Sequence, residues 1–366
     1  MRFLRGLRFT LFGFFSTSVL AFIQGCNLEE TAKATAVLIL LLLPFSCNAD
    51  FSDKIVWECS PDFADDEVCI MNFDGTGFMQ LTDNNLEDDD PFLSADGSLI
   101  AWECEPVPCC PEDICVMNAD GTNRRNLTND NMFDEDPHLS ADGKIVVWAC
   151  ERDFADLEIC IMNTDGTGLR VLTNNNITDE DPVISGNGEV IYWECGSGDA
   201  QEICKINADG TGFREITQNP IRDRDPQTDF SGYRVTYQCR DGDDICMQNI
   251  NGNGFKRLTF DGLNGDPTLS FNGQLVSFYC FDTGGVCVAK TDGSGVTRLT
   301  TTSIPGAHED VAFALNDDKI VFQCDPTNFA IPSEICVVNA DGTGFKQLTN
   351  NNYPDSDPAI AGNRSD

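Results

Sequence analysis

The sequence predicts an all-β fold, a seven-bladed β-propeller of four-stranded antiparallel blades. Three observations predict it: one unit recurs along the chain, each unit contains four short apolar runs, and Gly-containing turns separate these runs. A repeat period in the forties is typical of propellers, solenoids and arrays. Four antiparallel strands in each unit favour the propeller among these architectures.

The repeat is marked by the first residue of an Asp-Gly or Asn-Gly turn. Successive turns are 46, 45, 44, 42, 41 and 49 residues apart. Such a turn between apolar runs is a strong hairpin signal, so we expect it to join the last two strands of each blade. The seven positions are Asp74, Asp120, Asp165, Asp209, Asn251, Asp292 and Asp341.

Residues 158–195 show the content of one unit. The runs EICIMN and GLRVLT flank the turn, and the runs PVIS and EVIYWEC follow Asp181. These runs are too short for helices and are rich in Val, Ile and aromatic residues, which suits strands. We expect the first and innermost strand of each blade to begin after the Asp-Pro pair.

The two ends of the repeat region complete each other. The chain enters the repeats at residues 54–57, a second strand without a first strand before it, and its last strand near residues 358–361 is a first strand without a second. We expect this C-terminal strand to join the blade built from residues 54–82, which leaves no open sheet edge. Residues 50–366 then form a single propeller domain.

Residues 1–49 are expected to be an export segment. Basic residues 2–8 precede the apolar run 9–23, the arrangement of a secretory signal peptide, and a second apolar run covers residues 34–45. Either Cys26 is lipidated, because residues 23–26 resemble a bacterial lipobox, or the second run is the signal. Both alternatives predict export to the periplasm or the outer cell surface, with membrane contact only through such an anchor.

Cysteine usage also predicts an oxidising compartment. Fourteen of the 18 cysteines form local pairs, with the first Cys ending the second strand and the other opening the third. Such residues face each other across a hairpin at disulfide distance, whereas zinc sites need tighter clusters with His. The expected disulfides join Cys59 to Cys69, Cys104 to Cys115, Cys150 to Cys160, Cys195 to Cys204, Cys239 to Cys246, Cys280 to Cys287, and Cys324 to Cys336.

Cys109 and Cys110 are left over inside the second repeat. A vicinal disulfide, competition for Cys104 or Cys115, and metal binding all stay open for this pair.

An aromatic residue stands two positions before the first Cys of every pair. Positions i and i+2 share one face of a strand, so each ring should pack against the neighbouring blade. Strict recurrence at one strand position favours this core role over a sugar-binding platform. The seven residues are Trp57, Trp102, Trp148, Trp193, Tyr237, Phe278 and Phe322.

The chain is strongly acidic. Sixty Asp and Glu stand against 23 Lys and Arg, which gives a net charge of −37. This charge opposes binding to nucleic acid or to an anionic membrane surface, and it favours a basic protein or a metal cation as partner. High acidity also serves solubility.

An Asp precedes the innermost strand of each unit, and a second polar residue stands two positions earlier. If the innermost strands line the channel, these side chains crowd one of its mouths. Each Asp then either caps its own turn through backbone N–H groups or takes part in a site for a hard cation such as Ca²⁺. The seven candidate metal ligands are Asp90, Asp136, Asp181, Asp225, Asp266, Asp310 and Asp357. The seven earlier residues are Asp88, Asp134, Asp179, Asp223, Asn264, His308 and Asp355.

The order of these motifs resembles a known repeat. Leu-Thr, Asp-x-Asp-Pro, an Asp-Gly turn, a Trp and a hairpin of the type MNADGT follow one another as in the propeller repeat of the TolB-like family of cell-envelope proteins. The resemblance covers residues 50–361, and it implies a scaffold for protein contacts in the bacterial periplasm. Related repeats precede hydrolase domains in prolyl oligopeptidase-like enzymes.

This sequence departs from the family pattern. It has seven repeats instead of six, and the cysteine pairs are not part of the usual motif. We expect neither the additional N-terminal α/β domain of that family nor a hydrolase domain after the repeats.

The resulting expectation is a non-catalytic, exported binding or scaffold protein that uses an acidic face. The alternative is a propeller enzyme, a carbohydrate lyase or hydrolase that acts at the channel mouth with a divalent cation. Propeller lyases of similar fold place several His around a metal, and this sequence has only His138 and His308. A hydrolase with paired carboxylates is compatible with the sequence.

Overall fold

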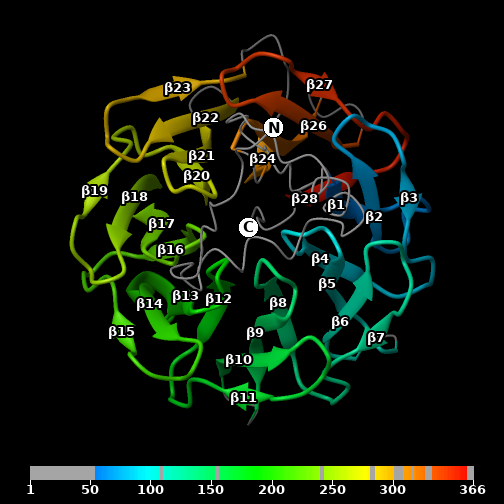
Figure 1. The fold of residues 1–366 in the computed structure, drawn as a ribbon, viewed down its shortest axis with the longest axis horizontal. Coiled ribbons are helices and arrows are strands. Elements are labelled where there is room, and N and C mark those ends of the chain that lie inside the picture. Colours follow the sequence, from blue (N-terminus) through cyan, green and yellow to red (C-terminus); the bar gives the residue numbers. More distant parts are fainter. Residues whose placement is uncertain are drawn as a thin grey trace, which may run out of the picture. The chain divides into compact units, whose positions relative to one another are not determined.

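The computed structural model describes residues 54–107, 110–152, 156–239, 243–280, 285–300, 308–314, 317–325 and 332–360. The expected export segment, residues 1–49, lies outside them. Within the described residues, 28 strands form seven four-stranded antiparallel sheets, arranged as the blades of a β-propeller (Figure 1). The predicted fold class and number of blades are confirmed. In this part of the chain no helix is both long enough and apolar enough to cross a membrane.

Each blade has the same four strand positions, and one 3-10 helix, η2 (Gly198–Ala200), lies between two strands of one blade. The innermost strands are β4 (Asp88–Leu93), β8 (Asp134–Leu139), β12 (Asp179–Ile184), β16 (Asp223–Thr228), β20 (Asn264–Leu269), β24 (His308–Phe313) and β28 (Asp355–Ile360). The second strands are β1 (Lys54–Cys59), β5 (Leu99–Cys104), β9 (Ile145–Glu151), β13 (Val190–Cys195), β17 (Arg234–Cys239), β21 (Leu275–Cys280) and β25 (Lys319–Cys324). The third strands are β2 (Glu67–Asn72), β6 (Asp113–Asn118), β10 (Leu157–Asn163), β14 (Glu202–Asn207), β18 (Asp244–Asn249), β22 (Gly285–Lys290) and β26 (Glu334–Asn339). The outer strands are β3 (Met79–Gln80), β7 (Arg125–Asn126), β11 (Arg170–Val171), β15 (Arg214–Glu215), β19 (Lys256–Arg257), β23 (Val296–Arg298) and β27 (Lys346–Gln347).

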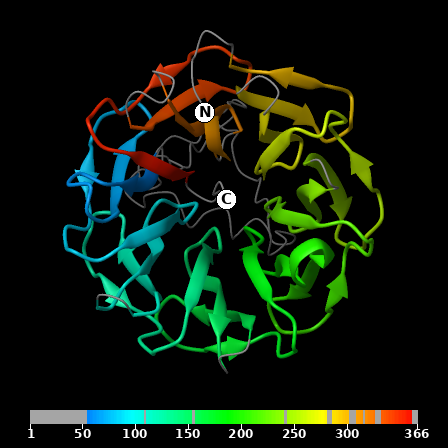
Figure 2. The same cartoon turned by 180° about the vertical axis from the view of Figure 1, so that it is seen from behind.

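The ring closes through the C-terminal strand, as predicted. β28 pairs with β1, with Ile360 opposite Ile55 and Asp355 opposite Cys59, so blade 1 has the order β28-β1-β2-β3. Blades 2 to 7 follow in sequence, from β4–β7 to β24–β27. In Figure 2 the red C-terminal strand lies beside the blue strands of blade 1.

The innermost strands begin earlier than the sequence predicts. β12 starts at Asp179, two residues before Asp181, and its pairing with β13 shifts between Glu180 and Val183. This shift is a β-bulge, in which an extra residue bends the strand. Asp181 occupies the bulge with a φ of 51°, a left-handed conformation that Asp tolerates better than most residues. The other six aspartates of the same repeat position also have positive φ: Asp90, Asp136, Asp225, Asp266, Asp310 and Asp357.

The core lies between neighbouring blades. Trp102 of blade 2 belongs to the same buried cluster as Cys69 and Ile70 of blade 1. Trp193 of blade 4 clusters in the same way with Ile159 of blade 3. The seven recurring aromatic side chains are at most 1% exposed, which confirms that they are packing residues.

The described residues contain the seven expected disulfides, with Cα–Cα distances of 5.8 to 6.0 Å. One detail of the prediction is wrong, because the second Cys does not open its strand. Cys69 is the third residue of β2 and lies opposite Trp57, while Cys59 lies opposite Glu67. Each bond therefore runs diagonally across the hairpin.

Two alternatives for the surplus cysteines, competition for Cys104 or Cys115 and a vicinal disulfide, can also be judged. Cys104 and Cys115 are bonded to each other, which rules out the competition, and Cys110 is a free thiol, which rules out the vicinal disulfide. Cys109 lies outside the described residues.

Candidate functional site: the acidic end of the propeller

The antiparallel pairing places the loops at two ends of the propeller. Asp88 lies opposite Cys104, and Cys104 lies opposite Asp113, so the start of an innermost strand meets the disulfide hairpin. We call this the acidic end; it also holds the loop from each outer strand into the next blade. The opposite end carries the Asp-Gly turns and the turns such as Ser94–Gly97, and we call it the turn end.

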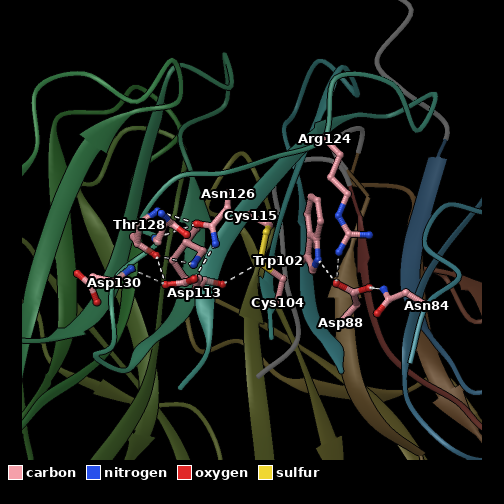
Figure 3. The surroundings of a disulfide bond; sticks show 12 residues. Asn84, Asp88, Trp102, Cys104, Asp113, Cys115, Arg124, Asn126, Thr128 and Asp130 are labelled. Atoms are coloured by element: carbon pink, nitrogen blue, oxygen red, sulfur yellow. Dashed lines mark hydrogen bonds and ion pairs between the residues drawn. A yellow bond between two sulfur atoms is a disulfide. The ribbon is translucent and has the colours of Figure 1, made fainter. Parts of the chain in front are cut away.

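Five of the innermost strands begin with an aspartate, and these five side chains are buried and not at a channel mouth, contrary to the prediction. Asp88 is fully buried, and its Oδ1 accepts a hydrogen bond of 2.7 Å from Trp102 Nε1 (Figure 3). Arg124 covers the face of Trp102 and pairs with the same carboxylate at 2.8 Å. A buried indole N–H needs an acceptor, and this aspartate supplies it. The pairs Trp57 with Asp355, Trp148 with Asp134 and Trp193 with Asp179 repeat the hydrogen bond.

A second set of acidic side chains holds the loops between blades. Asp113 at the start of β6 accepts hydrogen bonds from Asn126 Nδ2 and Thr128 Oγ1 (Figure 3). Glu334 at the start of β26 accepts one from the backbone N–H of Asn351 at 3.1 Å. These buried groups fix loops, so the exposed part of the acidic end is smaller than the count of carboxylates suggests. Glu67, Glu158 and Glu202 accept the matching hydrogen bond in blades 1, 3 and 4.

The bulge aspartates lie half-buried on the innermost strands, where a third set of carboxylates meets them. In three blades a Glu stands between the aromatic residue and the first Cys of the second strand. Its Oε1 accepts a hydrogen bond from the backbone N–H of the bulge aspartate of the next blade, at 2.6 to 2.7 Å. The pairs are Glu58 with Asp90, Glu103 with Asp136, and Glu194 with Asp225.

These contacts bring carboxylates from neighbouring blades together. Ligand oxygens of Asp181, Glu194 and Asp225 lie within 4.8 Å of one another, and so do those of Asp90, Glu103 and Asp136. The aspartates of both trios are among the metal ligands predicted from the sequence, whereas the glutamates are not. Glu194 has Trp193 and Cys195 as neighbours, and strand alternation puts it on the opposite face from them, which was the available signal.

Burial and mutual repulsion raise the pKa of carboxyl groups at the acidic end. Burial and the Asp225 carboxylate raise the pKa of Glu194 to about 8. Burial, with Asp66 and Glu87 nearby, likewise raises the pKa of Asp89 to about 8. Both effects disfavour the charged carboxylate, so this end gains from protons, cations or basic groups that reach it.

His138 takes part in packing. It is 7% exposed, lies against Phe92 with 4.0 Å between ring centroids, and its Nδ1 accepts a hydrogen bond from the backbone N–H of Ile184. This placement leaves it outside the carboxylate trios.

The architecture defines the class of protein, a seven-bladed β-propeller. Comparison with protein-family models matches residues 53–227 to the TolB beta propeller domain. The repeats in residues 53–227 are therefore similar to those of the TolB beta propeller domain. A search of curated proteins finds no match.

Solved structures share the fold at low sequence identity. TolB from Acinetobacter baumannii is 18% identical with a TM-score of 0.56, covering 85% of this chain and 67% of its own. An oligogalacturonate lyase in complex with manganese is 12% identical with a TM-score of 0.62, covering 79% and 86%. A puromycin-hydrolyzing peptidase of Mycobacterium tuberculosis is 14% identical with a TM-score of 0.63, covering 81% and 52%.

Proposed function

We propose that this chain is a non-catalytic, exported binding protein of the cell envelope, whose acidic end holds a basic or cation-bridged protein partner. The net charge of −37 and the grouping of carboxylates at one end carry the proposal. The match of residues 53–227 to the TolB beta propeller domain supports a role in protein contacts, and seven disulfides support an oxidising compartment.

The distribution of basic residues adds to this argument. Several basic side chains of the outer strands are occupied at the turn end, where they donate to backbone carbonyls of the next blade. Arg125 donates to Thr164 O at 2.6 Å, and Lys256 donates to Thr291 O at 2.9 Å. These cations therefore do little to neutralise the acidic end, and a basic surface would be steered toward it.

Two variants of equal net charge test the proposal. The acidic-end variant carries Asn at Asp62, Asp83, Asp156 and Asp261, and the turn-end variant carries Asn at Asp74, Asp120, Asp165 and Asp209. Each loses four negative charges, so only the place of the change differs. Both proteins are immobilised and incubated with an envelope extract, once with CaCl₂ and once with a chelator.

The acidic-end variant should capture at least tenfold less of any partner that the parent retains, and the turn-end variant should capture as much as the parent. Equal capture by both variants would contradict the proposed binding end. Dependence of capture on CaCl₂ would identify a cation-bridged contact, whereas loss in high salt alone would identify a directly bound basic partner.

A second candidate is a cation-dependent propeller enzyme that acts on polysaccharides. The carboxylate trios favour it, together with the likeness to a lyase in complex with manganese. A screen of acidic and neutral polysaccharides with and without Mn²⁺ or Ca²⁺ tests it. Cleavage that requires the metal and is lost in Asp181→Asn would establish the enzyme. Absence of cleavage of every polysaccharide would favour the binding protein instead.

A further inference from the structure

One position of the repeat distinguishes the blades at the acidic end. Between the aromatic residue and the first Cys, three blades have a glutamate, at Glu58, Glu103 and Glu194. The other four blades have Ala149, Gln238, Tyr279 and Gln323 there. A carboxylate at this point is therefore not needed for the blade to form.

Glu194 is the member of this set with the least access to water. It lies on β13 of blade 4 and is 1% exposed. Its Oε1 accepts the backbone N–H of Asp225 on β16 of blade 5 at 2.6 Å. Its Oε2 has no hydrogen-bond partner within the described part of the chain, although both oxygens of a buried carboxylate normally have one.

The carboxylates of Asp181 and Asp225 lie beside the Glu194 carboxylate. Both belong to β-bulges, with φ of 51° in each case, and ligand oxygens of the three residues lie within 4.8 Å of one another. Oxygens bound to one Ca²⁺ at about 2.4 Å are at most about 4.8 Å apart, because they can lie on opposite sides of the ion. The spacing therefore suits a single ion that contacts all three residues.

We infer that Asp181, Glu194 and Asp225 bind one hard divalent cation of the Ca²⁺ type between blades 4 and 5. The trio offers only carboxylate oxygens, which hard cations prefer, and no imidazole or thiolate that would select zinc. The ion would supply the missing partner of Glu194 Oε2 and would link β13 to β16 across the blade interface. This inference concerns the ion alone and holds whether or not the proposed protein partner exists.

Other charged groups lie near the trio and determine how strongly it attracts a cation. Glu180 lies opposite Glu194 in the sheet and adds negative charge, while Gln201 donates to Glu180. Arg222 lies near enough to both glutamates to favour their charged forms. Arg224 Nε lies 3.5 Å from Asp225 Oδ2. Two arginines against four carboxylates leave a negative site.

Calcium binding to the full chain tests the inference. The protein is stripped with EDTA, and Ca²⁺ is titrated by isothermal calorimetry at constant ionic strength, with a parallel melting curve in NaCl of equal ionic strength. Replacing Glu194 by Gln keeps the shape and the acceptor for the Asp225 N–H but removes the charge. We expect E194Q to bind about one ion fewer, or to bind that ion at least tenfold more weakly, and to lose at least half of the Ca²⁺-specific rise in melting temperature.

Glu334→Gln is the matched control. Glu334 is also fully buried, also has an unpartnered Oε2 among the described residues, and also accepts one backbone N–H, but it belongs to none of the carboxylate trios. E334Q should bind as many ions as the parent. Asp225→Asn is a second variant of the trio, for use if E194Q does not fold.

Two results would overturn the inference. The first is an unchanged stoichiometry and melting response in both trio variants. The second is a stripped parent whose melting temperature rises no more in CaCl₂ than in matched NaCl.

Discussion

Aspartates at the two ends of the propeller behave in opposite ways. At the turn end, the Oδ1 of Asp165 accepts hydrogen bonds from the N–H and the Oγ1 of Thr167, at 2.9 and 2.6 Å, and these bonds lower its pKa. At the acidic end, burial and neighbouring carboxylates raise the pKa of Asp89. The hydrogen bonds to the turn-end aspartate come from its own turn, whereas the acidic-end aspartate is affected most by burial and by Asp66 of the preceding blade.

The difference shows where a repeat protein is constrained and where it can vary. The turn-end hydrogen bonds recur with little change at Asp74, Asp120, Asp209 and Asp341. At the acidic end the Trp–Asp hydrogen bond recurs, but the groups around it differ: Trp148 is supported by Asp134 and Arg152, while the adjacent blade 4 has no such arginine pair among its described ion pairs. Contacts within one turn therefore recur with little change, whereas contacts at the acidic end vary with the residues that each blade supplies.

The largest effect is expected from removing β28. A chain ending at Tyr353 lacks the innermost strand of blade 1 and the Asp355 acceptor of Trp57 Nε1, a contact that spans 298 residues. The edge of β1 is then exposed, and the ring can no longer close. We expect the melting temperature to fall by about 10 °C or more, because the loss is several kcal/mol and each kcal/mol shifts the melting temperature by about 2–4 °C.

The turn end should respond much less to the same truncation. Hydrogen exchange of the backbone amides of Thr167 and Thr211, measured below the melting transition, would show how the turn end responds. Both residues lie far from blade 1 in sequence. A truncated chain that melts like the parent would contradict the closure by β28.

A smaller effect is expected from removing one disulfide at the acidic end. The double variant Cys150→Ala and Cys160→Ala opens the link between β9 and β10, which closes a loop with a sequence separation of 10. We expect the free energy of unfolding to fall by about 2–3 kcal/mol. Cys110→Ala serves as the control, because this thiol forms no disulfide and its loss should leave stability unchanged.

Peptide mapping without reduction checks the same pairing directly. Each pair should be linked within its own hairpin. A bond between Cys150 and Cys195, or any other link between blades, would contradict the register.

How much the sequence could predict follows from the same comparison of ends. The Asp-Gly turns, the cysteine pairs and the aromatic positions are local and repeat along the chain, so the blade number and the closure could be derived from spacing. The β-bulge at Asp181 could not, because Asp-Pro is equally compatible with a turn before the strand. The role of Glu194 could not be derived either, since it depends on an N–H of the next blade, 31 residues away in sequence.

The positions predicted from the sequence for Asp88 and its equivalents are also wrong. Their position at the entry to the innermost strands suggested that they lie at a mouth of the channel. Their burial depends on the Trp indole that the fold brings beside them, as between Asp88 and Trp102, and on how the strand pleat orients each side chain. Contacts within one turn are thus predictable from sequence, whereas contacts between strands and between blades require the structure.

A pH-dependent effect is expected from the loop-binding glutamates. Burial, with Asp355 nearby, raises the pKa of Glu334 above its ordinary value. The folded state then holds the proton more tightly than the unfolded state, so this group's stabilising contribution is full below the unfolded pKa and is lost as the pH rises through the folded pKa. Glu334→Gln lacks this loss and keeps the acceptor for the Asn351 N–H.

The free energy of unfolding of E334Q minus that of the parent should therefore be larger at pH 8 than at pH 4, by about 1–3 kcal/mol. This amount is the cost of an unsatisfied buried charged group. Thermal or urea unfolding at both pH values measures the difference. Glu202→Gln is the control, because Glu202 accepts the equivalent N–H of Asn219 from a partly exposed position and should show a smaller change. A difference between E334Q and the parent that does not vary with pH would contradict this explanation.

The smallest effect is expected at the turn end, where Asp165 can be replaced without loss of its main hydrogen bond. Asn251 occupies the same place in blade 5, and its Oδ1 accepts the N–H of Asn253 at 3.0 Å, so an amide serves this turn as well as a carboxylate. Asp165→Asn should melt within the error of the parent at pH 7, whereas Asp165→Ala, which has no acceptor, should melt lower.

Hydrogen bonds from Thr167 lower the pKa of Asp165, so its contribution is present above the unfolded pKa and is lost as the pH falls through the folded pKa. The difference between the parent and Asp165→Ala should therefore shrink in strong acid, the reverse of the behaviour expected for Glu334. If Asp165→Asn instead destabilises the fold as much as Asp165→Ala, then charge is what holds the turn, and the contrast between local turn bonding and long-range acidic packing fails at its simplest point.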